Sequence, residues 1–308
     1  MMYTLTIMKV IVTHSSPDWD AITSVWLLKR FLPNWSEAVV EYVPAGSRSL
    51  KFGESSKLTE VIEKIGEDEY THVDTGLGPL DHHQIESDKV CAASLTWEYV
   101  KKSQISNLKS QISNEERWEM KKEAIGRMVK VVVDIDHFKE VFWENPTADY
   151  HEFSFLGILE GLKVQKPNQD FVYIEFGVQI LDALLHKFES RVWAEKELKK
   201  RGQEFETRFG KALGIETIND SVVDLSQKMG YVIVVRKDPR KGYVRIKAHP
   251  GKEIDLTLVY EKLKKMDPEA TWFLHVSKKM LLNGSVKNPK MRPTTLTLDE
   301  ITEVLKKI

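Results

Sequence analysis

Cysteine is almost absent from this sequence of 308 residues, since Cys91 is the only one. A single thiol excludes an intrachain disulfide and a zinc site built from several cysteines, and it fits a cytoplasmic, reducing location. No apolar run approaches the ~20 residues that cross a membrane. Residues 1–8 have neither the basic start nor the long apolar segment of a signal peptide. Because residues 1–7 precede the first predicted strand, translation could start at Met1 or at Met8.

Net charge is also nearly absent, with 45 Lys and Arg against 46 Asp and Glu. This balance excludes a strong field that would steer the whole molecule to nucleic acid or to a membrane. The even total conceals two parts of the chain with opposite net charge. Residues 231–292 carry a local net charge of +9, whereas the remainder is acidic and holds six of the nine histidines before residue 152. A charge block is usually a solvated face, but this division also suits metals in one half and a phosphate-bearing ligand in the other.

The alternation of short β-branched runs with segments of helical period predicts an α/β fold with a parallel sheet in the N-terminal domain. We expect a catalytic, metal-binding domain over 1–175, a connecting helix over 176–215 and a smaller basic α/β domain over 216–308. The predicted strands are 9–13, 38–43, 70–73, 231–236, 243–247 and 271–275. The predicted helices are 20–32, 58–65, 91–101, 115–132, 178–210, 256–265 and 298–308. A direct repeat, KSQISN-L-KSQISN at 102–114, predicts a longer helix end or a surface loop.

His14, Asp18 and Asp20 follow the first predicted strand within seven residues. Ligands bind at the carboxyl ends of strands in a doubly wound sheet. Two carboxylates and an imidazole gathered there disturb one another's ionisation unless a cation joins them. The alternative is that Asp18 or Asp20 only caps the helix that follows.

A second group of such side chains follows the third predicted strand. Asp74 lies directly after that strand, and Asp81, His82 and His83 come seven residues later. Asp74 alone could be an ordinary turn residue, and the three adjacent residues could be an accident of the surface. Their occurrence beside the first group favours a common metal site.

Together, His14-x₃-Asp18-x-Asp20, Asp74 and Asp81-His82-His83 resemble the signature of the DHH phosphoesterase superfamily. This superfamily includes RecJ-type exonucleases, nano-RNases, cyclic-dinucleotide phosphodiesterases and class II inorganic pyrophosphatases. Its fourth motif is a further Asp, for which the sequence offers Asp134 and Asp136, and we favour Asp136. Residues 73–98 and 134–136 are also similar, more loosely, to the melanocyte-proliferating-gene branch, labelled metal-dependent protein hydrolases.

The resemblance implies a two-metal site. One ion would be held by His14, Asp18 and Asp136, the other by Asp20 and His82, with Asp74 bridging the two. Carboxylates and imidazoles without thiolate suit Mn²⁺, with Mg²⁺ or Co²⁺ as substitutes. Such ions activate water and neutralise a phosphoryl group, so Asp74 and His83 are the implied catalytic residues. His83 would contact the phosphate or donate a proton, or else orient a metal ligand. We interpret His72 and His137 as structural residues or as residues that orient a metal ligand.

The glycine-rich Gly-Gly-Gly-His loop of many family members is missing from the C-terminal part. In its place we expect a phosphate-binding set at the end of a strand, with one residue on the preceding strand. This substrate-binding set comprises Arg245, His275, Ser277, Lys278, Asn283, Gly284 and Ser285. The alternative is a solvated basic hairpin with Asn283-Gly284 as its turn.

The resemblance therefore implies a phosphoesterase, nuclease-like in substrate. It would hydrolyse phosphodiester or phosphomonoester bonds in short single-stranded oligonucleotides or phosphate-bearing small molecules, with the two domains closing over the ester. One alternative is a class II pyrophosphatase-like enzyme, although residues 236–241 do not match the Arg-Lys-Lys-Gln run of those proteins. Another is a nucleotide- or nucleic-acid-binding protein with little or no turnover. We expect no membrane partner, and a homodimer is compatible with the sequence.

Overall fold

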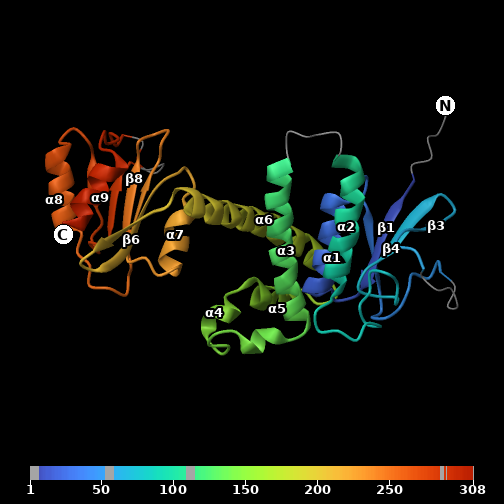
Figure 1. Cartoon of the computed structure of the whole chain (residues 1–308). Coiled ribbons are helices and arrows are strands. Elements are labelled where there is room, and N and C mark those ends of the chain that lie inside the picture. The colour runs from blue at the N-terminus through green and yellow to red at the C-terminus, as the bar shows by residue number, and fades with distance from the viewer. Residues whose placement is uncertain (1–6, 53–58, 109–114, 285–287, 289, 308) are drawn as a thin grey trace. The chain divides into compact units, whose positions relative to one another are not determined.

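The computed structural model describes residues 7–52, 59–108, 115–284, 288 and 290–307, with the backbone alone for 104–108. It shows an α/β protein of two compact units, Met1–Phe188 and Glu189–Ile308 (Figure 1). The first unit contains a four-stranded sheet and the second a six-stranded sheet. No helix of the described residues combines the length and the apolar character that crossing a membrane requires.

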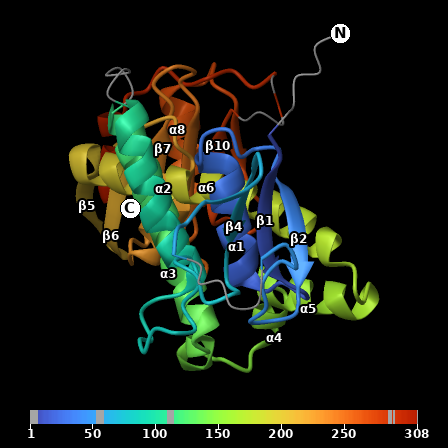
Figure 2. The same ribbon diagram turned by 90° about the vertical axis from the view of Figure 1, so that its right-hand side faces the viewer.

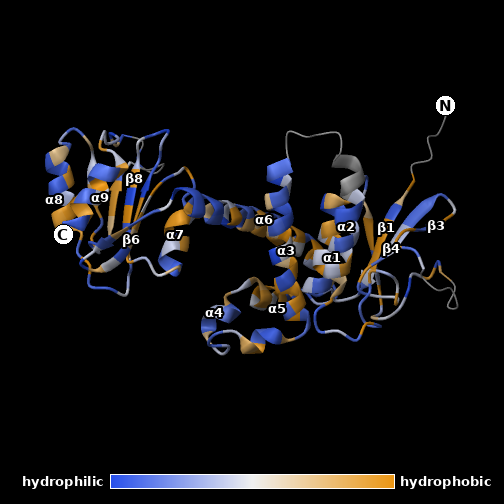
Figure 3. Cartoon of the chain, in the orientation of Figure 1, coloured by the Kyte–Doolittle hydropathy of each residue, from blue (hydrophilic) through white to orange (hydrophobic). Residues whose placement is uncertain are grey.

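The sheet of the first unit has the strand order β2-β1-β4-β3. Its strands are β1 (Lys9–His14), β2 (Val39–Val43), β3 (Glu63–Ile65) and β4 (Asp68–His72). The central strand β1 pairs in parallel with β2 and β4, as expected, and only β3 is antiparallel to its neighbour. Figure 2 shows β1 between β2 and β4. In Figure 3, β1 is hydrophobic and the edge strand β3 is hydrophilic. A hydrophobic strand fits the centre of a sheet, where both faces are covered.

Three helices, α1 (Trp19–Phe31), α2 (Ala92–Leu108) and α3 (Glu115–Asp136), lie on one side of this sheet, with α1 nearest to it (Figure 1). The first unit also contains α4 (Asp149–Glu152) and α5 (Phe155–Gln165), with a 3₁₀ turn at Lys139–Phe142. A further helix, α6 (Asp170–Arg201), starts in this unit and ends in the next. The last residue of α3 is Asp136, so the helix extends beyond the predicted end at 132 and carries this carboxylate at its C-terminus.

Two predicted helices are wrong. The one at 58–65 is replaced, within the described residues, by the short strand β3, which pairs back onto β4 through a turn where Gly66 has φ +63°. The one at 178–210 stops at Arg201, and the following residues form two strands, so 203–215 does not belong to a connecting helix. Tertiary pairing overrides local propensity here, because Phe205 becomes buried in the core of the second sheet. Of the direct repeat, the first copy lies in α2, and the second lies outside the described residues.

The sheet of the second unit has the order β5-β6-β7-β8-β10-β9 and is antiparallel except between β6 and β7. Its strands are β5 (Gln203–Thr207), β6 (Gly210–Glu216), β7 (Ile233–Lys237), β8 (Val244–Ala248), β9 (Trp272–Leu274) and β10 (Met280–Asn283). Its helices are α7 (Ser221–Lys228), α8 (Thr257–Met266) and α9 (Leu298–Lys306). Alternate residues of β7 face opposite layers: Ile233 and Val235 belong to the core with α8 and α9, and Val234 to the core with α7.

Close packing of α6 against α1 gives a test of the fold. A Cβ atom at Gly177 would lie 2.3 Å from Ile22 Cγ2, whereas one at Gly126 in α3 would meet no atom within 4 Å. Alanine favours a helix over glycine by about 1 kcal/mol, but overpacking costs about 1–3 kcal/mol. We expect Gly177→Ala to lower the free energy of unfolding and the control Gly126→Ala to raise it, both measured by urea denaturation. Equal effects of the two variants would contradict this packing.

Candidate metal centre

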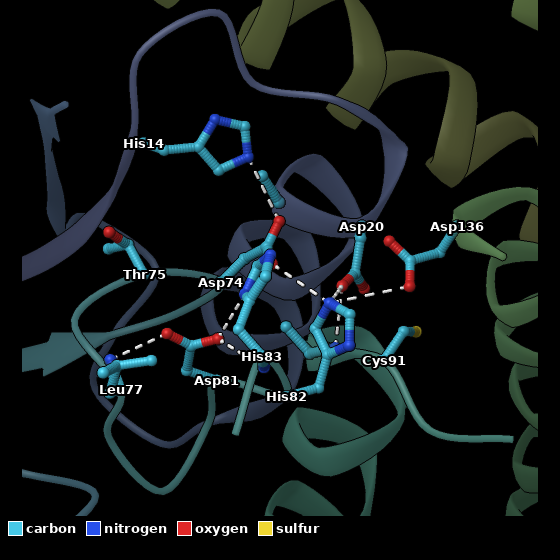
Figure 4. A network of polar contacts seen from close by, with 12 residues as sticks. His14, Asp20, Asp74, Thr75, Leu77, Asp81, His82, His83, Cys91 and Asp136 are labelled. Atoms are coloured by element: carbon cyan, nitrogen blue, oxygen red, sulfur yellow. Dashed lines mark hydrogen bonds and ion pairs between the residues drawn. The ribbon is translucent and has the colours of Figure 1, made fainter. Parts of the chain in front are cut away.

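The parallel pairing of β1 and β4 brings the first two groups of candidate ligands together (Figure 4). His14 is the last residue of β1, and Asp74 lies two residues after the end of β4, so both lie at the carboxyl edge of the sheet. His14 Nε2 is 3.1 Å from Asp74 Oδ2 and 3.9 Å from Asp18 Oδ2. Asp74 has a left-handed backbone with φ +53°. Such strain in a non-glycine residue is typical of a functional site.

Asp18 and Asp20 have different positions at the start of α1. Asp18 is the N-cap of the helix, because its Oδ1 accepts hydrogen bonds from the N–H groups of Asp20 and Ala21. Its other oxygen remains directed at His14. Asp18 can therefore cap the helix with Oδ1 and still offer Oδ2 to a metal ion, so the two interpretations are compatible.

Asp20 is buried and joins two helices. Its Oδ2 accepts from the N–H of Ala92 at 2.7 Å and its Oδ1 from the N–H of Ala93 at 2.6 Å. Both donors belong to the first turn of α2, where backbone N–H groups lack partners inside the helix and the helix dipole favours a negative charge. The Asp20 carboxylate is thus fixed beside the candidate site by the helix that follows the Asp81-His82-His83 segment.

His82 stands among three carboxylates. Its Nε2 lies 3.5 Å from Asp20 Oδ2, 3.6 Å from Asp74 Oδ1 and 3.5 Å from Asp136 Oδ2. Three of these atoms, His82 Nε2, Asp74 Oδ1 and Asp136 Oδ2, are buried without a hydrogen-bond partner among the described residues. Buried polar atoms rarely stay unpaired in proteins. Two ligands of one ion, each about 2.1 Å from it, lie at most about 4.2 Å apart, so these separations fit a shared cation.

Asp81 has a supporting position. It is fully buried, and its Oδ2 accepts from the N–H of Leu77 at 2.7 Å. Its Oδ1 lies 2.6 Å from His83 Nδ1 and accepts from the His83 N–H. Asp81 therefore holds the loop after Asp74 closed and orients the ring of His83, whose side chain is 59% exposed.

The carboxylates raise the pKa of both central histidines. Burial alone would lower the pKa of His14, but contact with Asp74 and the charge of Asp18 outweigh it and raise this pKa to about 9. The pKa of His82 is also raised to about 9, first by Asp74 and then by the charges of Asp136 and Asp20. Without a cation, both imidazoles therefore carry a proton at neutral pH.

The pKa values of several carboxyl groups in the site are raised as well, which disfavours their charged form. Burial, followed by the charges of Asp74 and Asp136, raises the pKa of Asp20 well above its ordinary value. Burial also raises the pKa of Asp136, with Asp18 and Asp74 adding to the effect. The site therefore holds more negative charge than its protein surroundings balance. A divalent cation would remove this imbalance, and the carboxylate and imidazole donors suit Mn²⁺ or Mg²⁺.

The alternatives around the motifs are distinguished by position. Asp136 lies beside His82, whereas Asp134 lines a separate cavity between α2 and α3. His72 Nε2 accepts a hydrogen bond from the Ser49 N–H, and burial, with the charge of Arg48, lowers its pKa to about 4. His137 Nε2 donates to the Val90 carbonyl at 2.9 Å, although this ring also lies near Asp136. His72 is thus a neutral, packed residue. His137 links the end of α3 to the segment before α2 through its hydrogen bond with Val90.

Two cavities meet at the candidate metal ligands. One of about 380 Å³ is lined by residues that include His14, Asp74, Asp81 and His83. Another of about 480 Å³ extends toward the segment that follows α3. Asp18 and Asp136 line both. The ligands are therefore open to solvent-filled space on two sides, as a site that receives a substrate requires.

The expected substrate-binding residues of the second unit are mostly engaged in its own structure. Asn283 is fully buried, donates to the carbonyls of Thr271 and Arg292 and accepts from the Thr294 N–H, so it is not available to a ligand. Gly284 has φ +81°, and a Cβ there would lie 2.0 Å from the Tyr243 ring. Asn283 ends β10, so Asn283-Gly284 is not the hairpin turn, which lies between β9 and β10.

The remaining four described residues of this set are on the surface. His275 Nδ1 lies 2.8 Å from the Ser277 hydroxyl in the turn between β9 and β10. Lys278 pairs with Asp255, and Arg245 pairs with Asp220. Exposed ion pairs contribute little stability, so these two cations can exchange partners. Ser285 lies outside the described residues.

Comparison with known proteins adds a distant structural likeness. No protein-family model matches the sequence, and no curated protein matches it. Among solved structures, the chain is similar to RecJ from Thermus thermophilus, crystallised in complex with Mg²⁺, with 12% identity and a TM-score of 0.28. The match covers 97% of this chain and 49% of RecJ, so the chain spans about half the length of that protein. The case for function therefore rests on the site itself.

The raised histidine pKa values predict how metal binding depends on pH. A metal ligand must be neutral imidazole, whereas His14 and His82 are protonated below pH of about 9. Mn²⁺ affinity should therefore rise between pH 6 and 9, by up to about tenfold per pH unit for each imidazole, and level off above. Calorimetric titration in buffers of different ionisation enthalpy measures both the affinity and the proton release. His14→Asn should reduce the slope, and a flat profile would contradict the assignment.

Replacing Asp20 and replacing Asp136 by alanine should change the stability of the metal-free protein in opposite directions. Asp20→Ala leaves two N–H groups of α2 without acceptors and should lower the free energy of unfolding by about 1–3 kcal/mol. Asp136→Ala removes a carboxylate whose raised pKa shows that its charge is unfavourable, so stability near pH 7 should rise. Both variants should bind Mn²⁺ more weakly. Thermal denaturation in a chelator and then in Mn²⁺ separates the two effects, and equal losses in chelator would contradict them.

Proposed function

We propose that this protein is a metal-dependent phosphoesterase that hydrolyses phosphodiester or phosphomonoester bonds in short oligonucleotides or nucleotides. The observation that supports this most is the convergence of Asp74 Oδ1, His82 Nε2 and Asp136 Oδ2, all buried without hydrogen-bond partners in the described part of the chain. A fold does not need such a cluster for its stability, since unpaired buried polar atoms cost free energy. Their use is to bind cations that act on an anionic substrate.

The ligand sets of the proposal follow the distances. His14, Asp18 and Asp74 form one group of potential ligand atoms, and His82 and Asp136 belong to another. We therefore propose Asp136 for the ion of His82, whereas the resemblance assigned it to the ion of His14 and Asp18. Asp20 adds an oxygen to the second group, 3.5 Å from His82 Nε2. Bound Mn²⁺, or Mg²⁺ or Co²⁺, would supply the positive charge that polarises a phosphoryl oxygen and acidifies water.

Asp74 and His83 have the most direct roles in this proposal. The two oxygens of Asp74 point to different groups, Oδ2 to His14 and Oδ1 to His82, as a bridging carboxylate requires. Asp81 accepts from His83 Nδ1, which leaves Nε2 for the substrate. His83 would then hold a phosphate oxygen or donate a proton to the leaving group. Arg245, His275, Ser277 and Lys278 are proposed to bind phosphate on the second unit.

A substrate panel with a matched pair of variants tests the proposal. The panel consists of a five-nucleotide RNA, its DNA counterpart, a cyclic dinucleotide, a phosphorylated adenosine and pyrophosphate, each with and without Mn²⁺. We expect Mn²⁺-dependent hydrolysis that Asp74→Ala reduces by at least about 100-fold. The control Asp134→Ala removes a carboxylate that lines a different cavity and should retain activity.

The outcomes separate the classes of function. Preference for pyrophosphate would replace the esterase with a pyrophosphatase-like enzyme. Mn²⁺ binding without any turnover would indicate a binding protein or an untested substrate class. Absence of Mn²⁺ binding by the wild-type protein would refute the metal centre itself.

A further inference from the structure

The cavity of about 480 Å³ next to the metal ligands has a distinct second half. Its first half is formed by Asp18, Asp20 and Asp136. The rest of its lining comes mainly from Trp19 of α1, from the segment after α3 and from α5, and its described residues contribute rings and carboxylates but none of the cationic side chains that bind phosphate. The rings that line it are Trp19, Phe138, Trp143 and His151. The volume lies within the range of about 300–1,000 Å³ typical of small-molecule sites.

The charge of this cavity excludes a chain of phosphates. Besides the three candidate metal ligands, the lining includes Glu140, Glu152 and Glu160, and the described residues that form it include no Lys or Arg. A phosphate would be repelled everywhere except at the end where cations bind. The part of a substrate that enters the aromatic half is therefore uncharged or cationic.

Besides Asp136 Oδ2, two buried polar atoms of the described lining residues have no hydrogen-bond partner. The indole Nε1 of Trp19 is a donor, and Trp19 is only 4% exposed. Oε2 of Glu140 is an acceptor. A ligand that supplies one acceptor and one donor would satisfy both. The edge of a nucleobase presents such groups side by side.

Phe138 provides a surface for stacking. Its ring is 75% exposed although it lines the cavity, and its backbone is left-handed with φ +56° directly after α3. Exposed aromatic rings beside a groove are the usual platforms for bases of single-stranded nucleic acid.

We propose that this cavity binds the base of the nucleotide whose phosphate lies at the metal centre, an inference that rests on the proposed function. Phe138 stacks on the base, the Trp19 indole donates to a ring or carbonyl acceptor, and Glu140 accepts from an exocyclic amino group. An ionised carboxylate only accepts hydrogen bonds. In the same stacked pose, uracil places its N3–H where cytosine has the N3 acceptor and a carbonyl oxygen where cytosine has the amino group, so both contacts are lost. The cavity therefore prefers cytosine over uracil.

Three small ligands test this inference by binding alone. Cytidine 5′-monophosphate, uridine 5′-monophosphate and ribose 5-phosphate are titrated calorimetrically into the full chain, with Ca²⁺ in place of Mn²⁺ to suppress turnover. We expect the cytidine nucleotide to bind about tenfold or more tightly than ribose 5-phosphate, and more tightly than the uridine nucleotide. Equal affinity for all three would overturn the proposal.

Matched variants assign the effect to the cavity. Phe138→Ala should weaken binding of the cytidine nucleotide roughly five- to hundred-fold and leave ribose 5-phosphate unchanged. The control Phe142→Ala removes a ring that is 83% exposed and does not line the cavity, and it should change neither. Glu140→Gln should abolish the preference for cytidine over uridine, whereas Glu144→Gln, on the surface outside the cavity, should retain it. Equal effects of a variant and its control would refute the assignment.

Hydrolysis of bis(p-nitrophenyl) phosphate, which has no nucleobase, separates this inference from the proposed function. If Mn²⁺ supports that hydrolysis but base and ribose ligands bind equally, the metal centre stands and the base site is wrong. If the cytidine nucleotide binds through Phe138 but no phosphate ester is hydrolysed, the base site stands and the phosphoesterase proposal is wrong.

Discussion

Mutual repulsion among four carboxylates is the constraint on which the site depends. Asp18, Asp20, Asp74 and Asp136 come from the start of α1, the loop after β4 and the end of α3, and their charges meet in a partly buried space. The protein balances them only in part, with two protonated histidines and the first turn of α2. Desolvation makes the remaining charge unfavourable. Bound cations would therefore stabilise this arrangement, and ion binding would then be linked to the stability of this region.

The fold meets this constraint with few elements. Parallel pairing of β1 and β4 sets the distance between His14 and Asp74, and α2 begins where its N–H groups can hold Asp20. Asp81 uses both of its oxygens to shape the loop that carries His82 and His83. Strain at Asp74 is tolerated because its neighbours on both sides are fixed: the Val73 N–H donates to the Val12 carbonyl, and the Thr75 hydroxyl donates to the Ser47 carbonyl. A change in any of these supports would displace a ligand without removing one.

The sequence predicted which Asp and His side chains lie close together better than it predicted the elements between them. Local motifs place His14, Asp18 and Asp74 directly after strands, and a strand end has a definite position in a parallel sheet. The helix predicted at 58–65 and the helical continuation past Arg201 were wrong, because the pairing of β3 and the burial of Phe205 are decided by distant residues. The residue type of Asn283 suggested a phosphate-binding residue. Only the structure shows that both its side-chain NH₂ and its side-chain oxygen are already hydrogen-bonded within the protein. The segment after Asp136 has no motif, although its density of aromatic and acidic residues was a visible signal.

The charges around the candidate metal centre also favour one direction of approach for an anionic substrate. On one side of Asp18 and Asp136 the cavity contains His14 and the exposed His83, and on the other its described lining consists of rings and carboxylates without Lys or Arg. The carboxylates of Asp74 and Asp81 on the His83 side are buried, so a polyanion is repelled less there than on the side that carries three glutamates. Under the proposed function and the proposed base site, a substrate longer than one nucleotide would therefore extend past His83, with its terminal base in the aromatic half. These two proposals together predict cleavage at a chain end, since the aromatic side has no place for a second phosphate.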